Sequence, residues 1–259
     1  MNKYLEFFCI AIRHEQRHRS IILGRSAFYI VLLLIYSSLW RAAEHSGLRV
    51  EYSAAEMLWY LATTEWIVLS TPSIYLDIEG DFRNGSLVYQ LARPVSYLGS
   101  RLAENLGTAV VRMAYLAVVG ITCTTFFSGE FLLRTDMLPW IIALGLLAQV
   151  LCVLSVLVIG LCSFWLHECS PIYWVWQKLL FIFGGLILPL SIYPEWLQSI
   201  AKITPFYPTL YGVGRLVSEG SNALAMETLA LLLVWLMACL LLVAAVYQRA
   251  LRGLEIAGG

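Results

Sequence analysis

Residues 137–165 read MLPWIIALGLLAQVLCVLSVLVIGLCSFW, and this run decides the fold class. It contains no Asp, Glu, Lys or Arg. A helix needs about 20 largely apolar residues to cross the hydrocarbon core of a bilayer, and this run is longer than that. The stretch therefore predicts a membrane-spanning α-helix.

The rest of the chain has the same character. Hydrophobic residues make up 60% of the 259 residues and charged residues only 13%, whereas soluble domains are roughly 45–50% apolar and about 25% charged. We expect an all-α polytopic membrane protein with a single transmembrane domain over residues 1–259. It should contain six spans, at residues 21–40, 54–76, 108–127, 137–165, 171–192 and 224–247.

The distribution of charge predicts the orientation. Basic residues gather before the first span, between the second and third spans, and after the last span. Because Lys and Arg are enriched on the cytoplasmic side of membranes, both termini and the loop over residues 77–107 are expected in the cytoplasm. The whole chain carries 17 basic and 17 acidic residues, without a basic tail or stripe. The expected partner is therefore the lipid bilayer, and no nucleic acid is expected.

The loop over residues 77–107 is the longest polar stretch, DIEGDFRNGSLVYQLARPVSYLGSRLAENLG. Gly80, Asn84-Gly85 and Pro94 interrupt it. Between these residues, Ser86–Leu91 is predicted to form a short helix, and a second helix is predicted to begin after Pro94 and lead into the third span. We expect an ordered cytoplasmic element.

A second unusual region covers residues 189–219. It follows the fifth span and holds Pro189, Pro194, Pro205 and Pro208. Since proline breaks helices, the fifth span is expected to end or kink near Pro189. Residues 195–203 are predicted to form a short amphipathic helix that carries Trp196, an aromatic residue suited to the membrane interface. The region then forms either a short re-entrant hairpin in the outer leaflet or an ordinary interfacial loop.

Near the N-terminus, the residues His14-Glu15-Gln16-Arg17-His18 fit the H-E-x-x-H pattern of zinc proteases. Neighbouring arginines oppose a dication, and a zinc site also needs a third ligand and a shaped cavity. The competing interpretation is an interfacial helix over residues 1–20 with basic residues at headgroup level. We favour that helix and expect neither a metal site nor catalytic residues. Its apolar stripe is predicted to be Leu5, Phe8, Cys9 and Ile12.

Four polar residues lie inside predicted spans: Glu65, Gln149, Gln177 and Lys178. Ionisable groups in a bilayer are costly, and they are usually paired or functional. Glu65 and Lys178 either form an ion pair or are separate, with Lys178 reaching the headgroups and Glu65 protonated or hydrogen-bonded. The two glutamines line a polar pathway or bond helix to helix.

The segment GSLVYQLARPVSYLGSRLAENLG (residues 85–107) resembles the membrane permeases of ABC exporters in the type-2 export class. One branch of that class has an acidic residue and a glycine, then Leu-x-Arg-Pro-Val-Ser, after its second span. The segments YPEWLQSIAKITPFYP (193–208) and RALRGLEIAGG (249–259) are also similar to that branch. The departures are Ala92 and the pair Tyr89-Gln90, which replaces a plain aliphatic pair. The matching residues are Glu79, Gly85, Leu91, Arg93, Pro94, Val95 and Ser96.

The resemblance implies a transport subunit in a bacterial cytoplasmic membrane. A coupling helix in the 77–107 loop would dock on a separate ABC ATPase, and two permeases, identical or related, would enclose the path. Arg93 would pair with the ATPase or with Glu79, or anchor to a lipid headgroup. The implied coupling residues are Glu79, Asp81, Arg83, Leu91, Arg93, Pro94 and Ser96, and the implied outer gate residues are Pro189, Pro194, Trp196 and Pro205.

The sequence contains no G-x-x-x-x-G-K-[ST] phosphate loop. We therefore expect this chain to bind no cofactor and to be no enzyme, with ATP and Mg²⁺ on the partner ATPase. The alternative is a self-contained secondary carrier or channel, which would work without an ATPase. Such carriers usually contain inverted repeats, and none is visible here.

Overall fold

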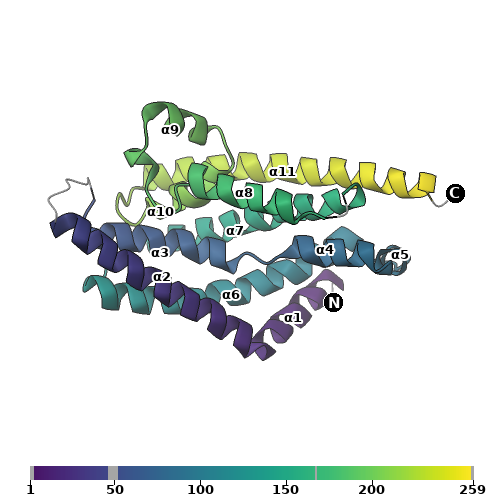
Figure 1. Cartoon of the computed structure of the whole chain (residues 1–259), viewed down its shortest axis with the longest axis horizontal. Coiled ribbons are helices and arrows are strands. Elements are labelled where there is room, and N and C mark those ends of the chain that lie inside the picture. Colours follow the sequence, from purple (N-terminus) through teal and green to yellow (C-terminus); the bar gives the residue numbers. More distant parts are fainter. Residues whose placement is uncertain (1–2, 46–51, 167, 258–259) are drawn as a thin grey trace.

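A computed structural model describes residues 3–45, 52–166 and 168–257. Within these ranges every regular element is a helix (Figure 1). The elements are α1 (Lys3–Arg17), α2 (Arg19–His45), α3 (Ala54–Ser70), α4 (Ile74–Arg83), α5 (Ser86–Leu91), α6 (Tyr97–Ser128), α7 (Leu138–Leu161), η1 (Cys162–Phe164), α8 (Ser170–Phe183), η2 (Leu190–Ile192), α9 (Glu195–Lys202), η3 (Tyr207–Tyr211), α10 (Gly212–Gly214) and α11 (Asn222–Ala257).

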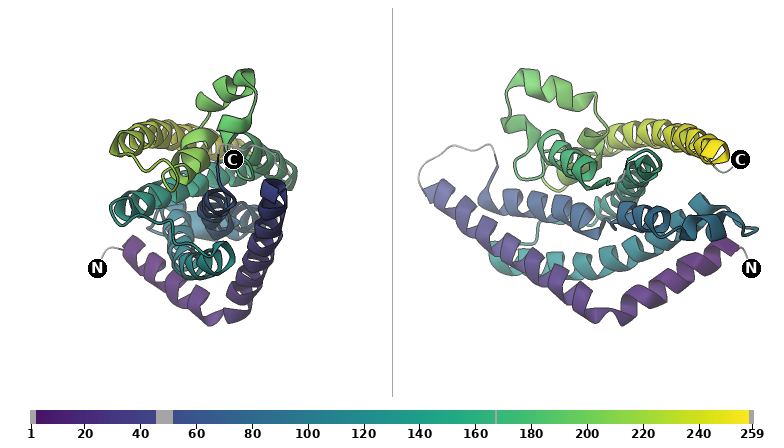
Figure 2. Two further views of the ribbon diagram at one scale, coloured as in Figure 1. Left: turned by 90° about the vertical axis from the view of Figure 1, so that its left-hand side faces the viewer. Right: turned by 45° about the vertical axis from the view of Figure 1, so that its right-hand side comes forward.

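Most of the long helices run side by side along the longest axis of the molecule (Figure 1). α3 lies in the middle of this bundle and packs against α2, α6 and α7, while α7 also packs against α11. α1 turns back from α2 at a sharp elbow and lies along α6 (Figure 2). The start of α1, the end of α11 and helix α5 all lie toward the same end of the molecule (Figure 1).

In the described part of the chain, four helices are long and apolar enough to cross a bilayer: Ser20–His45, Tyr97–Ser128, Leu138–Phe164 and Asn222–Arg252. They correspond to the first, third, fourth and sixth predicted spans. The other two helices are shorter than predicted, since α3 has 17 residues and α8 has 14. At 1.5 Å per residue, α3 covers about 26 Å and α8 about 21 Å, against a hydrocarbon core of roughly 30 Å. Six continuous spans are therefore confirmed only in part.

α3 is surrounded by protein, which allows it to be short. Every residue from Met57 to Glu65 is buried. Its last turn is followed by Pro72, which has no backbone donor to continue the helix. The guanidinium of Arg25 in α2 donates to the carbonyl oxygen of Leu69 at 2.5 Å. Arg25 thus satisfies one of the last carbonyls of α3, which no later residue of that helix can reach.

α8 ends at Phe183. The sequence predicted an end or kink later in the chain, near Pro189. Gly185 has a φ of 63°, in the left-handed region that favours glycine, and it turns the chain out of the helix. The carbonyl oxygens of Gly185 and Leu186 accept hydrogen bonds from the hydroxyls of Tyr60 (2.5 Å) and Thr64 (3.1 Å) in α3. The helix of the fifth predicted span is therefore terminated by a glycine turn that α3 holds, earlier in the chain than the end or kink predicted near Pro189.

The predicted amphipathic helix at residues 195–203 is confirmed as α9. The side-chain amide of Gln198 donates to two backbone carbonyls of the preceding segment, which fixes α9 to it. Beyond α9, the buried elements η3 and α10 return toward α11. There the guanidinium of Arg215 lies over the rings of Tyr207 and Tyr211 and pairs with Glu227 of α11 at 3.0 Å. The second part of the 189–219 region is therefore fixed to the last long helix.

Candidate functional site

The site begins with α4, which the sequence did not predict. Ile74 and Ile78 are fully buried, and an added Cβ on Gly160 of α7 would approach the Ile78 side chain within 2.8 Å. This close packing along one face stabilises the helix, even though Gly80 lies inside it and glycine costs roughly 1 kcal/mol in a helix. The first part of the 77–107 region is therefore helical, and α4 begins three residues before that region, inside the predicted second span.

α5 has the predicted bounds, Ser86–Leu91. Gly85 has a φ of 69° and reverses the chain between α4 and α5, a conformation that few other residues adopt. The hydroxyl of Ser86 does not cap its own helix, because it donates to the carboxylate of Asp81 at 3.0 Å. After the turn that contains Pro94, α6 begins behind its N-cap residue Ser96, as predicted.

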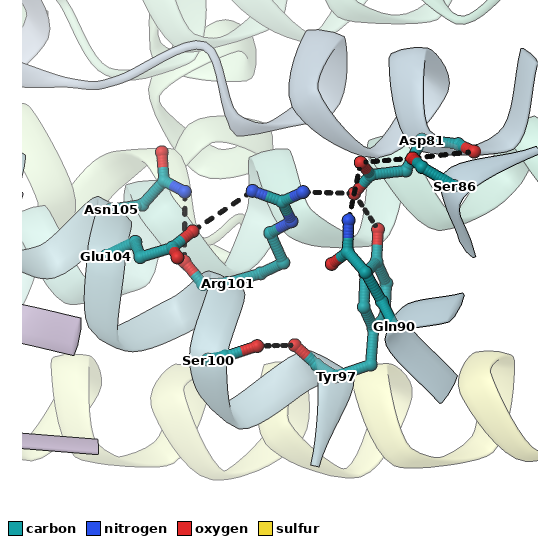
Figure 3. Close-up of polar contacts among 8 residues, drawn as sticks. All are labelled: Asp81, Ser86, Gln90, Tyr97, Ser100, Arg101, Glu104 and Asn105. Carbon is teal, nitrogen blue, oxygen red and sulfur yellow. Dashed lines mark hydrogen bonds and ion pairs between the residues drawn. The ribbon is translucent and has the colours of Figure 1, made fainter. Parts of the chain in front are cut away.

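Four side chains donate to the buried carboxylate of Asp81 in α4 (Figure 3). From α5, the Ser86 hydroxyl and the Gln90 amide donate to Oδ1 at 3.0 and 2.8 Å. From α6, the Tyr97 hydroxyl donates to Oδ2 at 2.8 Å, and the guanidinium of Arg101 forms an ion pair with the same oxygen. We call these five residues the Asp81 junction. It connects α4, α5 and α6 through one side chain.

The electrostatics of the Asp81 junction favour a fixed geometry. A buried carboxylate is costly unless it is paired and hydrogen-bonded, and each hydrogen bond to a charged group contributes about 1.5–3 kcal/mol. Arg101 also pairs with Glu104 on the next turn of α6 at 3.0 Å, so its position is set from two sides. One turn before Asp81, burial raises the pKa of the Asp77 carboxyl, while the guanidinium of Arg101 opposes that shift.

Glu79 lies on the same short helix but binds elsewhere. Its Oε2 accepts the backbone N–H of Cys169, the N-cap residue of α8, at 2.9 Å. Its Oε1 lies 3.4 Å from a guanidinium nitrogen of Arg83, which is a longer ion pair. The predicted pair between Glu79 and Arg93 is therefore absent from the structure, since Arg93 is exposed and Glu79 is occupied by other partners. A carboxylate at the start of α8 also interacts favourably with the helix dipole.

The outer surface of α5 is exposed. Val88 is 69% exposed and Tyr89 is 77% exposed. The cationic side chains of Arg83, which precedes α5, and Arg93, which follows it, are also exposed. Large apolar side chains on a protruding helix are typical of an interaction surface. We call Val88, Tyr89, Arg83 and Arg93 the α5 tip.

The first residues of α1 contact the turn that contains Pro94, between α5 and α6. The ammonium group of Lys3 donates to the carbonyl oxygen of Pro94 at 3.2 Å, and the backbone N–H of Ser96 donates to the hydroxyl of Tyr4 at 3.3 Å. The Tyr4 ring also covers Gly99, where an added Cβ would come within 2.5 Å of it. The N-terminal helix therefore supports the turn that precedes α6.

α1 continues along α6 with a closely packed face. An added Cβ on Gly107 would lie 2.6 Å from the backbone oxygen of Phe8 and 3.1 Å from the Ala11 side chain. Ala11 is buried, whereas Leu5 is 50% exposed. A helix is thus present where an interfacial helix was predicted, but its protein-facing side is shifted from the predicted stripe, because small residues allow the backbones to approach.

The H-E-x-x-H pattern lies at the other end of α1. His14 and His18 are exposed, with ring centroids 4.3 Å apart. Glu15 is buried, and its Oε1 accepts from the Nε of Arg112 in α6 at 2.7 Å. The acidic residue of the pattern is therefore engaged in packing α1 against α6. No three or more described His, Cys, Asp or Glu residues form a group that could hold a metal ion, and His167 lies outside the described residues.

The four polar residues of the predicted path are not gathered in one place. Glu65 is buried in α3 and makes no hydrogen bond or ion pair with the described residues. Lys178 lies on the exposed face of α8, over the rings of Trp174 and Phe181, so it does not pair with Glu65. The amide of Gln149 donates to Thr71 at 3.2 Å. Gln177 is half-buried in α8.

The predicted gate residues are also spread over the 189–219 region. Pro189 is buried and precedes η2, while Pro194 precedes α9 and is exposed. Trp196 is 65% exposed. Pro205 lines a cavity of about 260 Å³ between α7, α8 and α11, together with Phe206. Pro189 is thus buried and Pro205 half-buried, whereas Pro194 and Trp196 are exposed, so a gate built from all four remains a proposal.

Sequence reasoning named Asp81 as a coupling residue and did not find its partners. Ser86, Gln90, Tyr97 and Arg101 have no motif that marks them, since each is a common polar residue in a polar stretch. The only signal is spacing: Ser86 and Gln90 are four residues apart, and so are Tyr97 and Arg101, which places each pair on one helix face.

These features define a multi-pass, all-helical membrane protein with an exposed helix tip held at one end of its bundle. The sequence matches the family of the ABC-2 family transporter protein over residues 22–258, which is most of the chain, and the protein belongs to this family. Its members are membrane permeases of ABC transporters, so the resemblance found in the sequence is confirmed and the chain is a transport subunit. No curated protein matches the sequence.

Proposed function

We propose that this chain is the permease of an ATP-driven exporter in a bacterial cytoplasmic membrane. Both termini and the α5 tip face the cytoplasm, where separate ABC ATPase subunits bind ATP and Mg²⁺. The observation that carries this proposal is the exposed α5 tip at the end where α1 begins and α11 ends (Figure 1), held there by the buried Asp81 junction.

α5 is the coupling helix in this proposal. Val88 and Tyr89 supply an apolar surface, and Arg83 and Arg93 supply positive charge on either side of it. This combination suits a groove with an apolar floor and an acidic rim on the ATPase. Leu91 ends α5, and Pro94 and Ser96 shape the turn that leads into α6.

Transport follows from movement of α5. Two permeases, identical or related, enclose the path, and ATP-driven closure of two ATPase subunits displaces both α5 helices. The helices connected to α5 then tilt and open the path to the outside. In this scheme Glu65, Gln149, Gln177 and Lys178 contribute polar groups to the path, and the region around Pro189, Pro194, Trp196 and Pro205 closes its outer end.

The proposal is tested by purifying the tagged full chain from its native host. We expect an ABC ATPase to copurify and the Arg93→Glu variant to lose it, because the reversed charge faces the acidic rim. The matched control is Arg134→Glu, which reverses an exposed arginine between α6 and α7. Normal ATPase binding by Arg93→Glu would contradict the coupling assignment.

The alternative function is a self-contained secondary carrier or channel. It is tested with the purified chain in liposomes without any ATPase. The exporter proposal predicts no solute movement under these conditions and ATP-dependent movement once the ATPase is added. Movement of solute by the chain alone would identify it as a carrier or channel.

A further inference from the structure

Two carboxylates of α4 connect the same short helix to different parts of the bundle. Glu79 and Asp81 are two positions apart, which places them about 200° apart around the helix axis. Both are buried. Asp81 binds α5 and α6, whereas Glu79 binds the start of α8. α4 is therefore connected to two distant helices through opposite faces.

The first connection runs from α5 to α6 and α1. Asp81 accepts from Gln90 in α5 and from Arg101 in α6, so α5 and the first turns of α6 are held by one side chain (Figure 3). α6 is in turn packed along α1, through Gly107 and through the buried pair of Glu15 and Arg112. A displacement of α5 thus reaches α6 and α1 together.

The second connection runs from α4 to α8. Glu79 accepts the backbone N–H of Cys169 at 2.9 Å, and the ring of Tyr75 in α4 stacks on Tyr173 in α8 with centroids 4.4 Å apart. At its far end, α8 runs into the glycine turn held by Tyr60. Movement of α4 thus reaches α8, which leads to the outer region.

We propose that Asp81 and Glu79 are positioning residues that transmit a displacement of α5 along two separate routes, from Asp81 to α6 and from Glu79 to α8. The transmission rests on the proposed function, since it requires an ATPase that moves α5. The two separate anchors rest only on the contacts within this chain.

The two carboxylates differ in the chemistry that they need. Each carboxylate oxygen of Asp81 accepts from two donors. In Asp81→Asn one of these oxygens is replaced by an N–H₂ group, which would then face two donors instead of accepting from them. Glu79 needs one acceptor for the N–H of Cys169, and the oxygen of an amide supplies it. Asp81→Asn should therefore break its connection, whereas Glu79→Gln should keep its connection and Glu79→Ala should break it.

The first experiment measures hydrogen–deuterium exchange of the full chain in lipid nanodiscs. For Asp81→Asn we expect exchange in α5 and the first turns of α6 to rise about tenfold, which corresponds to about 1.4 kcal/mol, with α8 unchanged. For Glu79→Ala we expect the rise at the start of α8, with α5 unchanged, and for Glu79→Gln no rise. The matched control is Glu104→Gln, which removes the other partner of Arg101 and should leave α5 unchanged.

The second experiment measures movement rather than stability. In a background without the six native cysteines, spin labels at the exposed positions Val110 (α6) and Val175 (α8) are each paired with a label at Ile142 (α7). When the copurifying ABC ATPase and ATP are added, we expect both distances to shift. Asp81→Asn should abolish only the α6 shift, and Glu79→Ala only the α8 shift, with Glu79→Gln restoring it.

The outcomes separate the two proposals. If each variant abolishes both shifts, or neither, the two-route inference is wrong. If the exchange changes do not follow the pattern of the two anchors, it is also wrong, whatever the ATPase does. If no ATPase copurifies, or if neither distance shifts in the unaltered chain, the proposed function and the transmission role fail together, while the exchange experiment still decides whether the two anchors exist.

Discussion

The buried ion pair between Glu15 and Arg112 gives a quantitative test of how α1 is held. The Arg112 Nε lies 2.7 Å from the Glu15 Oε1, and the two side chains are only 11% and 6% exposed. At an effective dielectric constant of about 20, unit charges at this separation attract by about 6 kcal/mol, and desolvation offsets most of that energy. Removing one partner leaves the other charge buried. We expect Glu15→Met and Arg112→Met each to lower the free energy of unfolding by about 3–5 kcal/mol.

The double variant distinguishes this explanation from simple loss of packing. In Glu15→Met/Arg112→Met neither charge of this pair is left buried without its partner, so the unfolding free energy of the double variant should be closer to that of the unaltered chain than either single variant is. The measurement is reversible unfolding in mixed detergent micelles, followed by tryptophan fluorescence. The control pair is Arg134 with Asp136, which is exposed, and there Arg134→Met should change the unfolding free energy by no more than about 0.5 kcal/mol.

The reasoning about the ion pair is refuted if the losses simply add. Independent sites add within about 0.3–0.5 kcal/mol. A double variant that loses the sum of the two single losses would show that Glu15 and Arg112 do not interact across the α1–α6 contact. A second sign of failure would be a single-variant loss below about 1 kcal/mol, the typical value for an exposed pair.

Three further predictions concern close packing at glycine, the H-E-x-x-H pattern and the α5 tip. Gly107→Val should lower the free energy of unfolding by about 1–3 kcal/mol, because its Cβ would meet the backbone of α1. Gly80→Ala should not lower it, because the space around Gly80 is open. Thermal unfolding measures both variants. His14→Ala/His18→Ala should leave transport and bound-metal content unchanged, and loss of zinc by elemental analysis would restore the protease interpretation. Arg93→Ala should weaken ATPase copurification without changing the amount of chain in the membrane, measured by immunoblot; unchanged binding would indicate a lipid-facing role.

Much of the architecture could be predicted from the sequence, because long apolar runs have few alternatives in a bilayer. Residues 137–165 form the longest such run, and the structure places α7 and η1 there. The short helix at Ser86–Leu91 was also predicted correctly, since Gly85 and Pro94 limit it on both sides. Composition and turn residues act locally, so they can be recognised without knowledge of distant contacts.

The ends of α3 and α8 could not be predicted in this way. Hydropathy alone extended the second span to residue 76 and the fifth to residue 192, but the helices end at Ser70 and Phe183. Pro72 follows the last turn of α3, where Arg25 satisfies the Leu69 carbonyl. After α8, the hydroxyls of Tyr60 and Thr64 satisfy two backbone carbonyls from a distant helix. A broken helix at membrane depth is stable only where other segments supply such donors.

The sequence by itself determined an all-helical membrane protein, its four long apolar helices and the bounds of the short helix α5, because these depend on local hydrophobicity and turn chemistry. The tertiary structure alone decided the roles of the charged residues. Glu15 belongs to an H-E-x-x-H pattern in the sequence and is a buried partner of Arg112 in the structure. Asp81 is a coupling residue implied by the resemblance, and in the structure it accepts from four donors. The reason is physical: the function of a carboxylate depends on its burial and on the donors around it, which come from segments distant in the sequence.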